Sequence, residues 1–288
     1  MKAAATLRKQ IESALAGRIP AALSPRPYSA PELLPCGLAE VDAMLGGGLP
    51  LGAITELTGP HSSGRTTLVL ATLAELTQQG HSCAYVDVSD ALDPLSAAAL
   101  GVDLRHLLWI RSNWIRTKTS RPEAARPKAS SDSDLRLDPA LRATDLLLNA
   151  GGFRALVLDL GDLPPEQARR IPLATWYRFR LQAEKSRTLF LLITCAQGCE
   201  QSCAESRVQV VEKSYAKSCA ALTLQCHPAS PHWRQAAANA PLLLAGLHYR
   251  ISLERGRAVD PTRKKPAASA PANKASEAAW SSTTPWTG

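Results

Sequence analysis

The segment GPHSSGRT, from Gly59 to Thr66, combines residue types and spacing suited to holding phosphate groups. It matches the pattern G-x-x-x-x-G-K-[ST] at every position except Arg65, and it lies between an apolar run and a run with helical spacing. Backbone amides of such a loop, and of the helix that follows it, point at one anion. We therefore predict that a nucleotide is bound by Gly59, Pro60, His61, Ser62, Ser63, Gly64, Arg65, Thr66 and Thr67.

The exception at Arg65 changes the expected strength of this binding. Arginine keeps the positive charge of lysine, but it is larger, planar and fork-shaped. We expect nucleotide binding to be weakened rather than abolished. Thr66 would ligate Mg²⁺ through its hydroxyl when the nucleotide is bound. The alternative is a glycine turn that only joins the strand to the helix.

The hydrophobic pattern predicts the elements that position this loop. We expect strands at 54–59, 82–88, 106–112, 154–160 and 187–195, several of them buried, and helices at 66–80, 95–101, 139–151 and 176–186. Strands that alternate with helices imply right-handed crossovers and a mostly parallel central sheet with helices on both faces. Two later strands, at 219–226 and 248–256, would add an antiparallel extension to this α/β fold.

Composition divides the chain into a core and two flanking segments. We expect an N-terminal helix and linker at 1–33 and the core at 34–257. A polar, basic stretch at 113–136 is typical of a flexible insertion in that core. The Ala/Pro-rich, basic tail at 258–288 is predicted to be disordered.

Charge and hydropathy limit the kinds of partner. The 288 residues carry a formal net charge of +8, which favours nucleic acid, phosphates or an acidic protein surface, although basic linkers alone would also produce it. No apolar run is long enough to span a bilayer, and 45% hydrophobic residues suffice for a sizeable core. The N-terminus does not resemble an export signal, so we expect a cytoplasmic protein with reduced cysteines.

Two longer strings make the sequence similar to a known family. The segment from Cys36 to Leu68, with LGGGLPLG before the phosphate loop, resembles the start of the bacterial RecA core. The segment from Cys83 to Leu108, with ALDP and LGVDL, continues the likeness. RALVLDL and TLFLLITC agree with it, so that the resemblance runs from Leu34 to about Leu253. It implies a RecA-like P-loop core with ATP and Mg²⁺ as cofactors.

The resemblance transfers poorly where hydrolysis needs specific groups. Asp159 matches the family's magnesium-binding aspartate, but Ser89 stands where the family has the glutamate that activates water. Asp90 beside it is a weak candidate for that base. Cys195 occupies the position of the family's γ-phosphate-sensing glutamine, and Gln197 is a less favoured stand-in. We therefore expect little ATP hydrolysis.

A shortened RecA core with altered catalytic positions resembles the ImuA-type accessory proteins of SOS-induced mutagenesis. The final string LHYRISLERGR is similar to the hairpin that closes such proteins. The likeness implies a role in translesion synthesis with a polymerase partner, and RecA and single-stranded DNA as further partners. The family's DNA loops would lie at 161–175 and 196–218, and the second lacks their glycine-rich, basic character. The alternative is an active DNA-dependent ATPase that uses Arg65, Thr66, Asp159 and Asp90.

Cysteines and tail tryptophans permit further interpretations. Cys195, Cys199 and Cys203 recur every four residues, which would suit a metal site, but the spacing of the later cysteines favours incidental thiols. Trp280 and Trp286 lie in the predicted disordered tail. They could anchor a short peptide in a groove, or they could be residues without a selected role. We favour incidental thiols and an unselected tail.

Overall fold

The computed structural model describes the part of the chain that forms the core, and it divides the chain into two units, Met1–Pro31 and Glu32–Gly288. Described residues are 6, 32–111, 134–161, 163, 165–195, 218–235, 242–256 and 277–283. Apart from Thr6, the predicted N-terminal helix therefore lies outside the described residues. Most of the predicted insertion, 112–133, lies outside them too.

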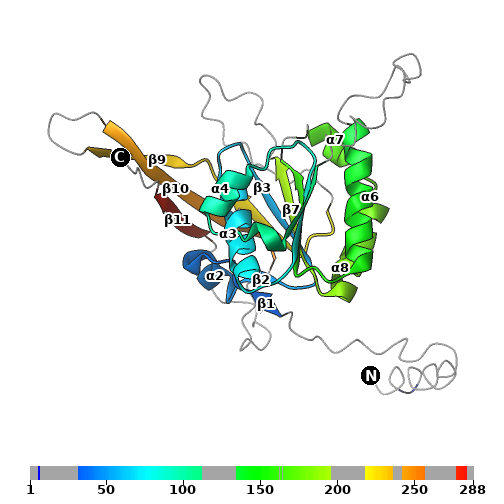
Figure 1. Ribbon diagram of the computed structural model, residues 1–288. Helices are drawn as coiled ribbons and strands as arrows, with labels where there is room; N and C mark the ends of the chain where they lie inside the picture. Colours follow the sequence, from blue (N-terminus) through cyan, green and yellow to red (C-terminus); the bar gives the residue numbers. More distant parts are fainter. Residues whose placement is uncertain are drawn as a thin grey trace, which may run out of the picture. The chain divides into compact units, whose positions relative to one another are not determined.

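A parallel sheet forms the centre of the second unit (Figure 1). Its neighbouring strands are, in spatial order, β3 (Ile54–Gly59), β7 (Leu189–Cys195), β6 (Ala155–Leu160), β4 (Cys83–Asp87) and β5 (Leu107–Arg111). Gly59 pairs with Cys195, and Asp87 pairs with Asp159. The ends of these strands therefore meet at one edge of the sheet. This confirms the predicted parallel core.

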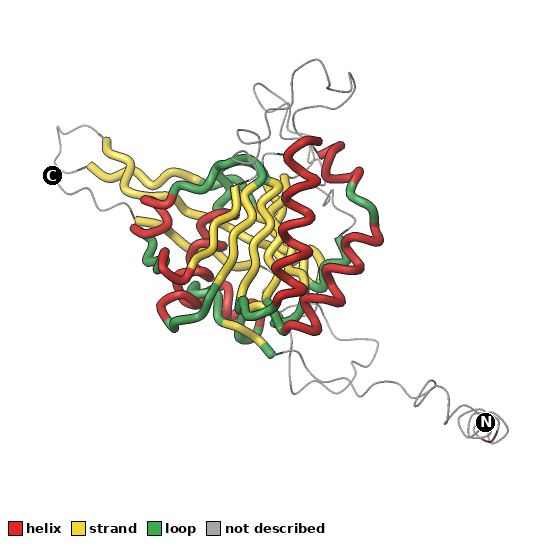
Figure 2. Tube along the Cα trace, turned by 45° about the vertical axis from the view of Figure 1, so that its right-hand side comes forward, coloured by secondary structure: helices red, strands yellow, loops and turns green. Residues whose placement is uncertain are grey.

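Helices cover both faces of this sheet, as predicted (Figures 1 and 2). One face packs against α2 (Ala39–Leu45), α3 (Arg65–Gln78) and α4 (Pro94–Ala99). The other packs against α6 (Asp134–Ala150) and α8 (Leu173–Ser186), and the short α7 (Pro165–Arg170) precedes α8. Alternate residues of each strand serve the two clusters because side chains in a strand point to opposite faces.

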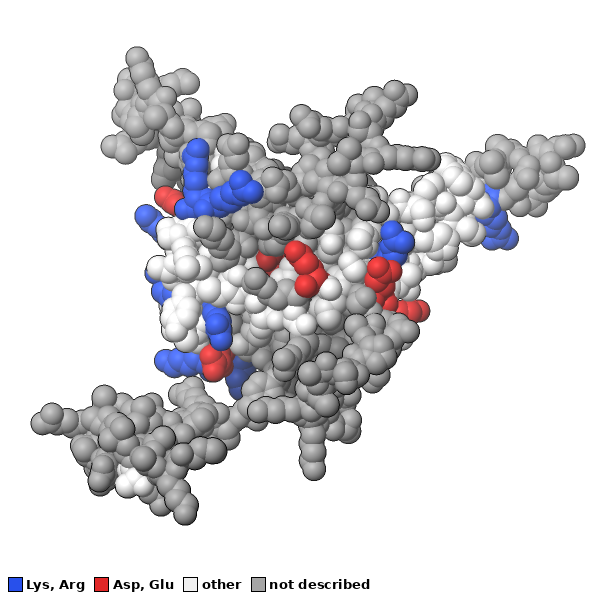
Figure 3. All heavy atoms as spheres, turned by 180° about the vertical axis from the view of Figure 1, so that it is seen from behind, with Lys and Arg blue, Asp and Glu red and all other residues white. Residues whose placement is uncertain are grey.

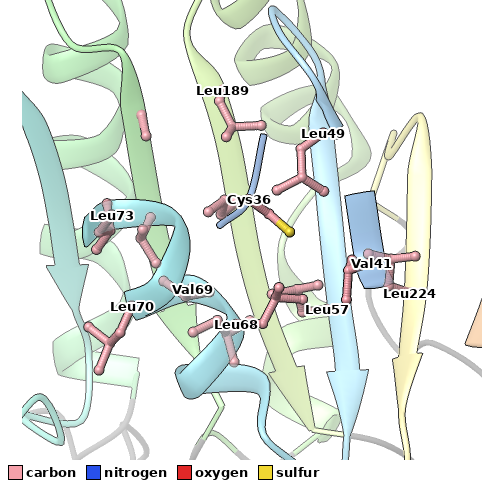
Figure 4. Packing of buried hydrophobic residues seen from close by; sticks show 14 of the residues in the cluster. Cys36, Val41, Leu49, Leu57, Leu68, Val69, Leu70, Leu73, Leu189 and Leu224 are labelled. Carbon is pink, nitrogen blue, oxygen red and sulfur yellow. The ribbon is translucent and has the colours of Figure 1, made fainter. Parts of the chain in front are cut away.

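Aliphatic side chains make up most of both layers, and the α8 side also contains a cluster of aromatic rings. Figure 4 shows Leu68 and Leu73 of α3 with Leu57 of β3, all fully buried. On the opposite face, the ring of Phe179 makes edge contacts with Trp176 at 6.1 Å and with Phe190 at 5.8 Å between ring centroids. Each layer thus buries a continuous apolar surface against the sheet.

The start of α6 corrects one predicted boundary. We expected a flexible insertion up to residue 136 and a helix from Pro139, but the helix begins at Asp134. Proline is common in the first turn of a helix, which made Pro139 the natural start. The preceding residues DLRLD include good helix formers, so the helix extends before the proline and contains it.

An antiparallel extension borders β3 on its other side. β8 (Leu222–Cys226) runs parallel to β3, and β10 (Leu242–Arg255) runs antiparallel to β8. β9 (Ser230–Gln235) pairs with β10 and forms a ribbon with it. A separate small pair joins β1 (Leu33–Leu34) to β2 (Leu49–Pro50). These findings confirm the predicted antiparallel extension, which begins between β8 and β10, because β8 is still parallel to β3.

The tail contributes a strand that we did not predict. Within the segment 258–288 that we expected to be disordered, Glu277–Thr283 forms β11, which pairs antiparallel with β10. Trp280 is buried and stacks on Tyr249, with 5.4 Å between ring centroids. Ala278 is buried on the same face. One apolar face in a polar, Ala-rich segment is a weak sequence signal, so the disorder prediction was wrong for these residues.

The helices add one finding about membranes. Within the described ranges, none of the helices has the length and apolar character needed to cross a bilayer.

Candidate nucleotide-binding site

The predicted phosphate loop lies where β3 ends and α3 begins. Gly64 precedes the first residue of α3 and has φ 85°, and Ser62 has φ 58°. Such left-handed residues turn successive amides toward one side, which makes an anion-binding concavity. The 14-residue helix α3 adds the positive end of its dipole. The backbone at this turn therefore has the geometry that an anion cradle requires.

Two glycines in this loop have no room for a side chain. A Cβ at Gly59 would lie 2.4 Å from the carbonyl oxygen of Cys226 and 2.8 Å from Ser63 Oγ. A Cβ at Gly64 would lie 2.5 Å from the ring of Tyr249. The loop is therefore packed tightly against strands β8 and β10 of the antiparallel extension.

Exposure separates the loop residues into an outer and an inner group. His61, Ser62 and Thr66 are exposed, and Pro60 and Thr67 are partly exposed. Ser63, Gly64 and Arg65 are buried. Ser63 Oγ has no hydrogen-bond partner among the described residues, although it is fully enclosed. A buried hydroxyl without a partner is costly, and a phosphate oxygen beside the loop would provide an acceptor.

Arg65 is directed toward the end of β7. Its Nη1 donates a hydrogen bond of 2.6 Å to the carbonyl oxygen of Thr194. The hydroxyl of Thr194 donates at 3.0 Å to Glu56, which also accepts a 2.5 Å bond from Ser218. The arginine that replaces the family's lysine is thus attached to the sheet, and only 7% of it is exposed.

Asp159 is held by two hydrogen-bond donors. The hydroxyl of Tyr85 donates to Oδ2 at 2.6 Å, and the amide of Gly161 donates to Oδ1 at 2.8 Å. A Cβ at Gly161 would lie 3.0 Å from Asp159 Oδ1 and 3.3 Å from Arg65 Nη1. The guanidinium and the carboxylate therefore border the same small space.

These contacts bear on the predicted magnesium site at Thr66 and Asp159. Mg²⁺ in nucleotide sites is normally bound through one or two carboxylates together with substrate phosphates. Thr66 is exposed in the first turn of α3 and suits that role. Asp159 suits it poorly, because both of its oxygens accept hydrogen bonds and a buried guanidinium lies nearby. The donor set fits a divalent cation badly.

Asp90, the weak candidate for a general base, lies in an ion pair. Its two carboxylate oxygens accept bonds of 2.5 and 2.6 Å from Arg111, whose guanidinium lies over the ring of Trp109. The carboxylate raises the pKa of Arg111. A carboxylate held by a bidentate arginine is stabilised in its ionised form and is a poor proton acceptor. This geometry disfavours the catalytic role that we considered for Asp90.

Several residues at the site had escaped the sequence interpretation. Tyr85 and Thr194 lie in apolar strands that we assigned only to the core, and Tyr249 lies in a strand far along the chain. A tyrosine inside a buried strand needs a partner for its hydroxyl, and that rule would have drawn attention to Tyr85. No comparable signal marks Thr194, because its backbone carbonyl makes the contact.

The cysteines do not form a metal site within the described residues. In that part of the chain, no three His, Cys, Asp or Glu side chains are grouped to hold a metal ion. Cys195 and Cys226 are buried, and burial raises the pKa of Cys226 to about 12. Cys199 and Cys203, and with them most of the predicted second DNA loop and Gln197, lie outside the described residues.

Charge is spread over the surface in small groups. Figure 3 shows one face of the molecule, on which described Lys and Arg side chains lie in separate groups beside Asp and Glu. In the predicted first DNA loop, Arg169 and Arg170 at the end of α7 are exposed. On the face drawn in Figure 3, the described residues do not form a continuous basic stripe.

Known proteins that are similar in sequence to this chain include the phosphate loop in the matched region. The RecA N-terminal domain family matches residues 5–113, which begins ahead of the start at Leu34 that we expected. RecA of Brucella anthropi is 40% identical over 129 residues, which are 44% of this chain and 30% of that protein. RecA of Rhizobium rhizogenes is 34% identical over 177 residues, 56% of this chain and 43% of that protein.

The crystal structure of the RadB recombinase is also similar, with a TM-score of 0.49 and 19% identity, over 78% of this chain and 90% of that one. This chain spans less than half the length of the two RecA relatives. The sequence similarity over the phosphate loop and its flanking strands relates the chain to the RecA-like proteins.

Proposed function

We propose that this chain is a RecA-like accessory protein of the SOS-induced DNA damage response. In this proposal it acts in the cytoplasm in translesion synthesis, where it binds a polymerase partner of the ImuA-type system and RecA itself. Its phosphate loop holds a nucleotide that is hydrolysed slowly at most. The relation to RecA supports the DNA-repair setting, and the partner follows from the resemblance to the accessory proteins.

One observation carries the low hydrolysis: Asp90, which follows the water-activating position in the sequence, has both carboxylate oxygens bound by Arg111. Ser89 occupies the position itself, and serine has no basic group at neutral pH. Because phosphoryl transfer depends on positioned charge, losing the base and redirecting the loop's cation toward Thr194 both slow it. A core that holds a nucleotide with little turnover can still offer its surfaces to other proteins, which is the role that we propose.

A second candidate function is a DNA-dependent ATPase of the recombinase class. It is favoured by Asp159, which retains its place at the end of β6 beside the phosphate loop. The test is ATP turnover by the purified chain with and without single-stranded DNA, with RecA as the reference. We expect phosphate release close to the blank. Turnover within about tenfold of RecA, lost in Asp159→Ala, would establish the ATPase instead.

The partner is tested separately from the nucleotide. Affinity capture of the tagged chain from cells treated with a DNA-damaging agent should retrieve a translesion polymerase subunit, RecA or both. Capture that retrieves neither protein contradicts the accessory function, whatever the outcome of the turnover assay.

A further inference from the structure

We propose that the phosphate loop binds nucleotide phosphates without a divalent cation and that Arg65 supplies the positive charge in its place. The inference rests on the proposed nucleotide site and names the chemistry of its ligand: a nucleoside diphosphate or triphosphate free of Mg²⁺. It departs from the magnesium site that the sequence pattern at Thr66 and Asp159 predicts.

The first support is a cradle with an unmet polar group. Ser62 and Gly64 have left-handed backbones, and α3 begins directly after Gly64. Ser63 Oγ is enclosed within the loop, close to the Cα of Gly59, and has no partner among the described residues. A hydroxyl in that position can donate to a phosphate oxygen, which satisfies it and adds to the amides of the loop.

The second support is the position of the guanidinium. Arg65 is buried, and one of its nitrogens donates to the carbonyl oxygen of Thr194. A guanidinium has five N–H groups, so one such bond leaves capacity for phosphate oxygens. Because the bond fixes the group at the end of β7, its charge is preorganised beside the loop, and arginine binds phosphate in a bidentate manner.

The third support is the state of the carboxylate that would attract a cation. Asp159 accepts hydrogen bonds from Tyr85 and Gly161, and the Arg65 guanidinium borders the same space. A nearby positive charge reduces the local attraction for Mg²⁺. Glu56 does not offset this, because it alternates with Leu57 and thus faces away from α3. The positive charge of the Arg65 side chain therefore takes the place of a bound cation.

The experiment measures the binding of a fluorescent ADP analogue in magnesium and in excess EDTA. For the unmodified chain we expect dissociation constants that agree within about twofold. RecA, measured in parallel, provides the reference for a phosphate loop that carries lysine. Affinity that falls by about tenfold or more in EDTA would overturn the inference, as would the absence of binding in both buffers.

Arg65→Lys is the sharpest variant, because it restores the residue of the motif. A lysine keeps the positive charge but lacks the fork that reaches Thr194 and the phosphates together. Its charge is then no longer held beside Asp159, and the carboxylate regains its attraction for a cation. We expect binding by the variant to weaken about tenfold on adding EDTA. Arg105→Lys makes the same substitution at the opposite edge of the sheet from the phosphate loop, in the turn before β5. Its nucleotide binding should be as insensitive to EDTA as that of the unmodified chain. Equal insensitivity of Arg65→Lys and the unmodified chain to EDTA would remove Arg65 from this role.

A melting curve without ligand checks that Arg65→Lys folds. If it does not fold, the comparison of buffers on the unmodified chain still decides the matter. Partner capture uses no added nucleotide. Loss of the nucleotide inference therefore leaves the accessory function standing, and loss of the partner leaves the binding measurement intact.

Discussion

The sheet has two halves that are stabilised in different ways. In the parallel half, β3, β4 and β7 are buried along their entire length between helical layers. In the antiparallel half, β11 is an edge strand, and its main buried side chain, Trp280, stacks on Tyr249. The first half is covered by helices on both faces, whereas the outermost strand of the second is held mainly by one aromatic pair.

The phosphate loop lies where the two halves meet. Gly59 borders the carbonyl of Cys226 on β8, and Gly64 borders the ring of Tyr249 on β10. The loop is therefore formed by the parallel half and is covered from the antiparallel half. The phosphate loop is recognised from local sequence, but its packing involves Tyr249, which is stacked in turn against Trp280 of the tail.

Trp176→Ala should have the largest effect on stability. Trp176 is fully buried and contacts Phe179 at the edge of its ring. Its loss should reduce the free energy of unfolding by about 3–5 kcal/mol. Urea denaturation followed by circular dichroism measures this, with Trp176→Phe as the milder control. A loss below about 1 kcal/mol would contradict the account of the parallel half.

Trp280→Ala should act locally and cost less, about 1–2 kcal/mol, because β11 is an edge strand. Hydrogen exchange should become faster in 242–256 and stay unchanged in 54–59. Trp280→Phe keeps the stack and removes an indole N–H that has no partner among the described residues, so it should cost little. Faster exchange throughout the parallel strands after Trp280→Ala would break the distinction between the halves.

Gly64→Ala combined with Trp280→Ala tests whether the halves are coupled. A methyl group at Gly64 must displace the Tyr249 ring, which Trp280 holds in place. Removing Trp280 frees the ring, so the double variant should be more stable than the sum of the single losses predicts, by about 1 kcal/mol. Urea denaturation of the unmodified chain, the two single variants and the double variant gives this coupling free energy. Strict additivity would show that Tyr249 does not transmit the effect.

Asp103→Asn should have the smallest effect, which should be present near neutral pH and should disappear in acid. A hydrogen bond from Arg105 lowers the pKa of Asp103 to about 2, from 3.8. A carboxyl whose pKa is lowered on folding adds stability above its unfolded pKa and loses it as the pH falls toward 2. The melting temperature of the unmodified chain should therefore fall slightly more than that of Asp103→Asn between pH 5 and pH 2, as seen by calorimetry. A larger acid loss in the variant would reverse this sign.

Local patterns were sufficient for the parallel half. Strands buried on both faces are continuous apolar runs, as in RALVLDL and TLFLLITC, and glycines mark the ends of their helices. The antiparallel half was harder, because β9 and β11 are partly exposed and their sequences SPHWRQ and EAAWSST have no regular alternation. Their pairing depends on β10, which neither segment specifies.

Residues close together in the chain were enough to predict the phosphate loop, its place between β3 and α3, and the parallel direction of the core strands, but not the order of those strands. The tertiary structure added the hydrogen bond from Arg65 to the carbonyl of Thr194, 129 residues away, and the hydrogen bond from Tyr85 to Asp159. It also decided that Trp280 covers Tyr249 beside Gly64. The direction of a side chain and the partner of an edge strand depend on groups brought near by folding, and no local pattern encodes them.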